Sequence, residues 1–267
     1  MPNARLMVTS MMAFVQGCAT SGTQSDPFTV EPADLATQIA VVAVAPVAMS
    51  AGVTVPDSTR AHIDSLVIGQ FRGGGITVVD PAAYEALWAE VYESADPIFD
   101  SHTGERDEAA YQAAWADFYG KLATRYGATV VLFPEIWEVV ADVVSGYATW
   151  DGASQNMAST GTHILAVLDA IFPSDNGGAD ILPYGYVEAL SLNVVLEDAT
   201  GAPLYTHRAG IESLRKRISS DRLAPSDVLQ NWERLDDAVR RALGPVLDAY
   251  RNSALRSDDK TIAMPNR

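Results

Sequence analysis

Short runs rich in valine most narrowly constrain how this chain of 267 residues can fold. Residues 39–46 read IAVVAVAP, an apolar run that a proline ends. The valine content and the length of this run are typical of a strand that is buried on both faces. A strand of this kind needs cover on both sides, so we expect a sheet with helices packed on it.

A helix and a second strand follow this run in the sequence. Asp57 or Ser58 can cap a helix that runs to about residue 72, where three glycines end it. Residues 76–79 (ITVV) then begin another strand. This order predicts a β–α–β unit, parallel and right-handed. Two more helices are expected, one capped by Asp80 and one at about residues 107–126.

The second half of the chain predicts antiparallel strands and a closing helix. Pro134 is expected to mark a bulge or an edge in the longest strand, because proline cannot donate to a sheet ladder. Asp198 to Gly201 form a good hairpin turn, and Pro245 should kink the last helix. The expected elements are strands at residues 128–144, 145–155, 186–197 and 203–213, and helices at residues 162–172 and 226–250.

These patterns favour a single α/β domain at residues 37–251, followed by a polar tail at residues 252–267. Its mixed sheet should hold a parallel β–α–β unit near the amino terminus and an antiparallel hairpin late in the chain, with helices packed on the sheet. Hydrophobic residues make up 48% of the sequence and charged residues 19%, which excludes bulk disorder.

The amino terminus is typical of a processed export signal. Residues 1–17 contain Arg5, an apolar stretch at residues 6–15 and small residues before the only cysteine of the chain. The sequence Val15-Gln16-Gly17-Cys18 resembles the lipobox of bacterial lipoproteins. This resemblance implies a signal peptide that is cut before Cys18, diacylglycerol on the sulfur of Cys18, and an acylated amine.

Lipidation would anchor the protein in a membrane. Residues 18–36 would then hold the lipidated cysteine and a flexible tether, which begins ATSGTQSD after the cysteine. Ala19 implies sorting to the outer membrane, with the protein facing the periplasm. The alternative is an ordinary apolar segment in which Cys18 is a buried thiol.

The order of elements resembles a group of bacterial envelope lipoproteins. The lipobox, the strand IAVVAVAP, the glycine-rich turn and ITVVDP are similar to lipoproteins built on the fold of the TolB amino-terminal domain. These include the curli-secretion lipoprotein and the lipoprotein activators of peptidoglycan synthases. Residues 189–198 (ALSLNVVLED), with Gly201, Leu204 and Tyr205, resemble the paired late strands of that group.

The resemblance implies a non-enzymatic protein that binds or scaffolds another component of the cell envelope. No clear pair of amphipathic membrane hairpins like those of the secretion channel is present, so pore formation is not expected. An envelope hydrolase with an unrecognised site near Glu135, Asp151 or His163 remains an alternative, and so does a small-ligand module. The sequence leaves the oligomeric state open.

Charge and motifs exclude several classes of function. The formal net charge is −16, which argues against a nucleic-acid partner. The sequence lacks the GxSxG and HExxH signatures, and its single cysteine cannot form an internal disulfide. Residues 173–180 (PSDNGGAD) offer oxygen ligands to calcium. Their spacing does not match an EF-hand, and Asn-Gly-Gly is typical of an ordinary turn. We therefore expect no cofactor and no metal.

The aromatic segment at residues 147–152 (YATWDG) is the strongest candidate for binding a partner. Strand alternation places Tyr147 and Thr149 on one face and Trp150 on the other. Trp150 is expected in the core under a helix, although it would be a binding anchor if it were exposed. Tyr147, Trp150 and Asp151 are the candidate partner-binding residues. Glu135 and Glu138 should face opposite sides of their strand, as solvated edge charges.

Overall fold

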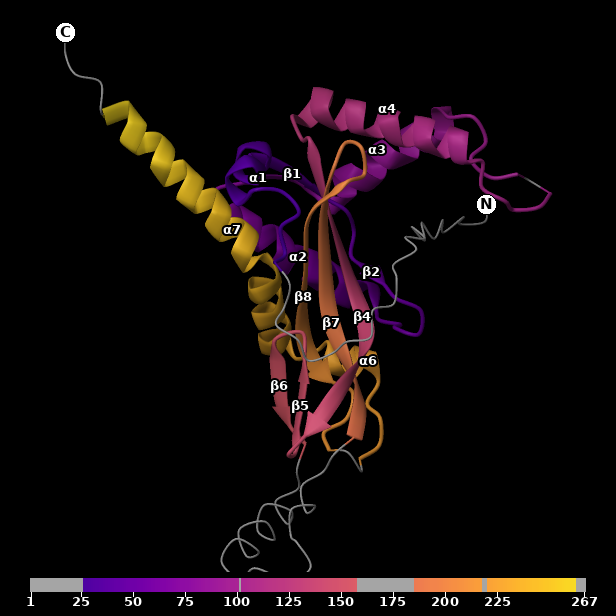
Figure 1. Ribbon diagram of the computed structural model, residues 1–267. Helices are drawn as coiled ribbons and strands as arrows, with labels where there is room; N and C mark the ends of the chain where they lie inside the picture. Colours follow the sequence, from indigo (N-terminus) through magenta and orange to yellow (C-terminus); the bar gives the residue numbers. More distant parts are fainter. Residues whose placement is uncertain (1–25, 101, 158–184, 218–219, 263–267) are drawn as a thin grey trace, which may run out of the picture.

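The computed structural model describes residues 26–100, 102–157, 185–217 and 220–262. One mixed sheet forms the centre, and helices pack against it (Figure 1). This arrangement confirms the expected α/β class. The strands are β1 (Val41–Val44), β2 (Ala48–Met49), β3 (Thr77–Val79), β4 (Val130–Val144), β5 (Tyr147–Trp150), β6 (Ala153–Asn156), β7 (Gly185–Asp198) and β8 (Pro203–Ser213). The helices are α1 (Pro32–Gln38), α2 (Asp57–Gly73), α3 (Pro81–Ser94), α4 (Glu108–Tyr126), α6 (Pro225–Val228) and α7 (Trp232–Ile262).

The predicted β–α–β unit is confirmed. β1 lies between β3 and β4 and pairs in parallel with both, with Val42 beside Val78 on one side and beside Val130 on the other. Three of its four residues are fully buried, because helices cover both faces of the sheet at this point. The valine-rich run therefore has the environment that its composition predicts.

β4 and β7 form the longest pairing of the sheet. They run antiparallel from Val130 opposite Asp198 to Val143 opposite Gly185. β8 continues from β7 through the predicted hairpin turn, in which Gly201 has a φ of +78°. Such a left-handed φ favours glycine. The late antiparallel hairpin is thus confirmed.

The expectation of an edge at Pro134 holds on one side of β4 only. The pairing of β4 with β7 continues without a shift at Pro134, whereas on the other side the pairing with β1 ends at Leu132 and the pairing with β2 begins at Glu135. The Leu132 carbonyl accepts from the Ala45 amide, and the Ile136 carbonyl accepts from the Ser50 amide. Alternate residues of β4 thus direct their backbone N–H and C=O groups toward β1 and β2. Pro134 therefore turns its missing N–H toward the gap where the chain leaves the sheet between these two strands.

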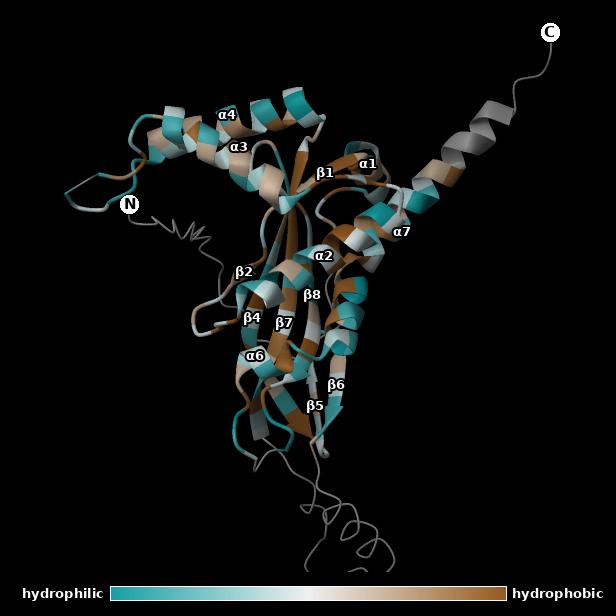
Figure 2. Ribbon diagram, turned by 180° about the vertical axis from the view of Figure 1, so that it is seen from behind, coloured by the Kyte–Doolittle hydropathy of each residue, from teal (hydrophilic) through white to brown (hydrophobic). Residues whose placement is uncertain are grey.

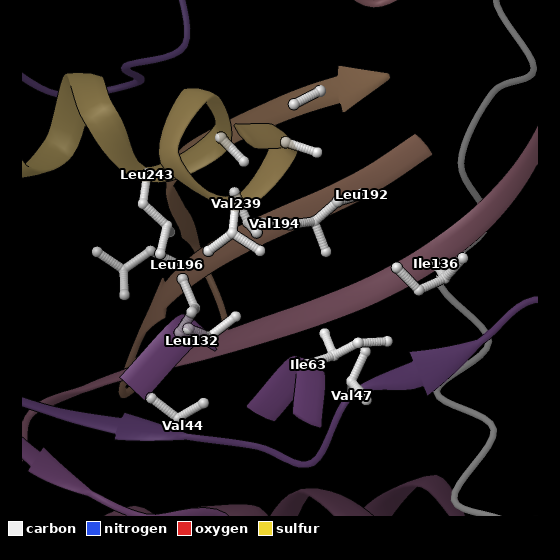
Figure 3. Packing of buried hydrophobic residues seen from close by; sticks show 14 of the residues in the cluster. Val44, Val47, Ile63, Leu132, Ile136, Leu192, Val194, Leu196, Val239 and Leu243 are labelled. Carbon is white, nitrogen blue, oxygen red and sulfur yellow. The ribbon is translucent and has the colours of Figure 1, made fainter. Parts of the chain in front are cut away.

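Three hydrophobic clusters lie around the sheet. The largest lies between the strands and helices α1, α2 and α7, and Figure 3 shows Ile63 of α2 and Leu243 of α7 beside side chains of the strands. The second lies on the opposite face, where aromatic rings of α3 and α4 pack together, as in Trp88 and Trp115 with centroids 4.7 Å apart. The third lies where the last residues of β4 pair with the first residues of β7. Figure 2 shows apolar residues running along both long strands.

Local signals account for most of the helix ends. The Asp80 carboxylate accepts from the Ala83 amide, and Asp107 caps α4 in the same way. Gly127 ends α4 with a φ of +73°. The cap expected for α2 is wrong, because the helix begins at Asp57 after Pro56 and none of the described side chains caps it.

The ends of the domain differ from the expected boundaries. The expected tether reaches too far, because the Thr206 amide donates to the Pro27 carbonyl and α1 buries Leu35. Pro27 and the described residues after it therefore belong to the folded domain. The last helix begins at Trp232 instead of residue 226, since a short α6 precedes it. It continues through the polar residues after 252 as far as Ile262, and it changes direction along its length (Figures 1 and 2).

Some expectations fall outside the described residues. The helix expected at residues 162–172, the oxygen-rich residues 173–180 and His163 all belong to residues 158–184.

Glu197 is a buried carboxylate on β7. It lies opposite Val131 of β4, on the face that α3 and α4 cover. Its Oε1 atom has no hydrogen-bond partner among the described residues. Burial, and then the neighbouring charge of Asp198, raise the pKa of Glu197 from 4.5 to about 7. The folded protein therefore holds this proton more tightly than the unfolded chain does.

We predict that Glu197→Gln makes stability less dependent on pH. Glu197 stabilises the fold most below about pH 4.5, and this contribution is lost as the pH rises through about 7. The glutamine cannot ionise, so its advantage in the free energy of unfolding over wild type should grow between about pH 5 and about pH 8. The gain should be a few kcal/mol at most, at about 1.4 kcal/mol per pKa unit. Urea unfolding across this range measures it.

The control is Glu93→Gln, which changes an exposed carboxylate on α3. This variant should keep the pH profile of the wild type. Equal profiles for wild type and Glu197→Gln would contradict the prediction.

Candidate partner-binding surface

The chain between β4 and β7 begins with a second hairpin. β5 returns along β4, with Tyr147 opposite Val144, and β6 then pairs with β5. The single strand expected at residues 145–155 is therefore wrong. Asp151 and Gly152 reverse the chain between β5 and β6, with φ of +40° and +72°. Because a left-handed φ is rare for a residue with a Cβ atom, Asp151 is held in a strained conformation.

Trp150 fixes this hairpin to the sheet. Its side chain is only 8% exposed, and its Nε1 atom donates to the Leu190 carbonyl of β7 at 3.1 Å. A Cβ atom on Gly210 of β8 would lie 2.5 Å from Nε1, so the indole packs directly on the glycine backbone. Trp150 is in the core, as expected, but β7 and β8 lie against it instead of a helix. A buried indole is not available to a partner.

Asp151 holds the tip of the hairpin. Its Oδ2 atom accepts from the Ser191 hydroxyl at 2.6 Å, and its backbone carbonyl accepts from the Gly210 amide at 2.9 Å. From α7, the Arg241 guanidinium donates to the Gly210 carbonyl at 2.6 Å. These bonds offset the strained backbone of Asp151, so the residue has a structural role in the hairpin.

On the other face of the sheet at this end, several large apolar side chains of the described residues are exposed. On the covered side, the third cluster contains Ala141, Val143, Ala148, Trp150, Met157, Val187 and Ala189. On the opposite side, Val140, Val144, Tyr147 and Tyr186 are between 46% and 74% exposed. We call these four residues the outer patch. They belong to three neighbouring strands, so they form one surface.

The strand register places the members of the outer patch close together. Val144 lies directly opposite Tyr147, and Tyr186 lies opposite Asp142, which puts it diagonally across from both valines. Direct and diagonal neighbours on one face of a sheet are within reach of an aromatic side chain. Asp142 thus lies between these aromatic and aliphatic groups, and a second carboxylate on this face, Glu188, lies opposite Val140.

Ion pairs border the outer patch. Arg222 contacts Glu138 at 2.6 Å, and Arg215 contacts Glu188 at 3.1 Å. Partly exposed pairs of this kind contribute little to stability, about 0–1 kcal/mol each. An apolar centre with a polar border is the usual composition of a protein–protein interface.

The structure separates the three candidate residues of the sequence. Tyr147 lies on the outer patch, whereas Trp150 and Asp151 fix the hairpin to the opposite face of the sheet. Tyr186 and both valines were missed. The segment VVADVV is apolar at both strand parities, so alternation alone does not show which valines are exposed.

Glu135 and Glu138 do face opposite sides of β4. Glu138 borders the outer patch, while Glu135 lies opposite Asn193 of β7. Neither lies on an edge strand, so their expected role as edge charges is wrong. Within the described ranges, no three His, Cys, Asp or Glu side chains gather in a position to hold a metal ion.

No protein-family model matches the chain, and no curated protein matches it significantly. In the described part of the chain, no helix is long and apolar enough to cross a membrane.

We predict that Gly210→Ala destabilises the protein through the hairpin. The new methyl group would lie within 3 Å of the Trp150 indole and of the Ala153 side chain. Relieving this overlap should cost about 1–3 kcal/mol in the free energy of unfolding, measured by urea titration.

Gly69→Ala in α2 is the matched control, because a Cβ atom there meets nothing within 4 Å. Alanine is the better helix former, so this change should be neutral or stabilise by up to about 1 kcal/mol. If both variants unfold like wild type, the close packing of Trp150 on Gly210 is incorrect.

Proposed function

We propose that this chain is a non-enzymatic lipoprotein of the bacterial outer membrane. It faces the periplasm and binds or scaffolds another protein of the cell envelope through the outer patch. The observation that carries this proposal is the gathering of four exposed side chains on one sheet face, namely Val140, Val144, Tyr147 and Tyr186. Exposed apolar groups that lie together mark interaction surfaces more often than scattered ones do.

The hydrogen-bonded framework of the outer patch supports this role. Its strands pair with one another, and the Trp150 and Asp151 contacts fix the hairpin to the opposite face of the sheet. A partner that contacts side chains on paired strands meets a surface that is already formed, which lowers the entropic cost of association. Tyrosine is also enriched among the residues that dominate binding energy. Asp142 favours a partner that offers a basic or hydrogen-bonding group to the centre of the patch.

The location rests on the amino-terminal sequence. Val15-Gln16-Gly17-Cys18 resembles a lipobox, and the order of elements resembles envelope lipoproteins. Pro27 is part of the fold, and the nine residue steps from Cys18 to Pro27 span at most about 30 Å. Acylation at both the sulfur and the amine would anchor the protein stably, because two acyl chains are enough.

We predict that Cys18 carries the lipid. Bacteria that express the chain would be labelled with a palmitate analogue, and the wild type should be labelled in the outer-membrane fraction. Cys18→Ser should abolish labelling, because serine does not provide the thiol that accepts the diacylglycerol. An unlabelled, soluble wild type with an intact amino terminus would refute the anchor.

We predict that the outer patch contacts a partner in the envelope. The photo-cross-linking residue p-benzoylphenylalanine would replace Tyr147 or Tyr186 in the lipidated protein. Both positions should give the same discrete product, because they lie on one face. Tyr126 at the end of α4 is the control, since it is exposed but lies outside the patch.

A second substitution, Val144→Glu, should reduce the cross-link by about tenfold or more, because a charge would be buried in the contact. A product that consists of two copies of this chain would identify the partner as the protein itself. Equal products from Tyr126 and the patch positions would overturn the proposal.

A further inference from the structure

A second surface feature lies between the amino-terminal ends of α2 and α7. It is a shallow pocket of about 460 Å³, within the usual range of small-molecule sites, about 300–1,000 Å³. The described residues that line it are Pro56, Ser58, Thr59, His62, Gln230 and Trp232. None of the outer-patch residues belongs to it, so this pocket is a separate site.

The lining combines one large aromatic surface with neutral polar groups. The Trp232 ring packs against the His62 ring, with centroids 4.2 Å apart and planes tilted by 54°, and Trp232 remains 42% exposed. Two hydroxyls and an amide complete the polar lining, and none of the six side chains is Asp, Glu, Lys or Arg. A charged ligand would therefore find no opposite charge among them.

Two polar side chains of the pocket are held away from solvent. The Nε2 atom of His62 is buried and has no hydrogen-bond partner among the described residues. Thr59 is only 3% exposed. Both groups are therefore closed to a ligand in the pocket. The polar lining side chains that a ligand can reach are Ser58 and Gln230, which are exposed.

The pocket walls are fixed before any ligand arrives. The Asn231 side chain accepts from the Arg234 amide at the start of α7, and it donates to Glu212 of β8 at 2.9 Å. This residue lies between the two lining residues Gln230 and Trp232. At the other wall, the Thr59 amide donates to the Pro56 carbonyl in the first turn of α2.

We propose that this pocket binds a neutral sugar ring of a glycan. A pyranose has an apolar face of C–H groups that can lie on an indole, and an edge of hydroxyls. Those hydroxyls both donate and accept, as do the exposed Ser58 hydroxyl and Gln230 amide. The shallow, open shape admits a ring that belongs to a longer chain. The inference does not depend on the lipid anchor or on the outer patch.

The test is calorimetric titration of the purified full chain with two neutral oligosaccharides, chitotetraose and maltotetraose. At least one should bind with a dissociation constant of about 1 mM or tighter. Its addition should also shift the NMR signal of the Trp232 indole N–H, assigned by its loss in Trp232→Phe. Inorganic phosphate is titrated in parallel as an anionic probe.

Three variants locate the binding. Trp232→Ala should weaken it by about tenfold or more, whereas Trp232→Phe keeps a flat ring and should stay within about threefold. Gln230→Ala removes an exposed amide from the lining, so it should weaken binding about 3–10-fold, the value of one hydrogen bond. Tyr126→Ala, at an exposed aromatic outside the pocket, should bind like wild type.

Several outcomes would overturn the proposal. These are no binding of either sugar at about 10 mM, binding of phosphate alone, and sugar binding that Trp232→Ala and Trp232→Phe both leave unchanged. Should Trp232→Ala fail to fold, the comparison between Trp232→Phe and Gln230→Ala still decides, because the proposal requires Gln230→Ala to bind more weakly. Loss of the envelope cross-links with sugar binding intact would refute only the proposed function.

Discussion

The rest of the structure depends on the long antiparallel pairing of β4 with β7. It runs from Val130 to Val143, and at about 3.4 Å per residue it extends beyond the helices. Near its beginning, α2 and α7 cover one face while α3 and α4 cover the other. Past Ile136 that double cover ends, and the β5–β6 hairpin covers one face only. The outer patch exists because the strands are longer than the helices that protect them.

Backbone amides that have no strand partner, at a break or an edge of the sheet, donate to particular side chains and segments instead. Where the chain leaves the sheet after β1, the Val47 amide donates to the Asp64 carboxylate of α2 at 2.9 Å. Burial raises the pKa of Asp64 to about 6, because the carboxylate that forms this bond has lost part of its hydration. The outer edge of β8 is covered at Thr206 by the Pro27 carbonyl and at Gly210 by the Asp151 carbonyl. Covered edges of this kind resist pairing with other chains.

The two proposed sites differ in their chemistry. The outer patch is a flat surface of tyrosine and valine, suited to another protein, whereas the pocket beside Trp232 is small and neutral, suited to a single ring. A lipid anchor at Cys18 would hold both sites near the same membrane. A protein that contacts a glycan and a protein partner at once could scaffold an envelope assembly without catalysing a reaction.

The sequence by itself determined the features whose cause is local. The valine-rich run became β1, Asp80 and Asp107 became helix caps, and the turn at Gly201 joined two strands, because each depends on neighbours within a few residues. Tertiary structure decided the rest. Which valines of VVADVV are exposed, what lies against Trp150, and why Pro134 is tolerated all depend on the strand that lies alongside. That neighbour comes from far away in the chain, so periodicity gives the spacing of side chains but not the face that stays uncovered.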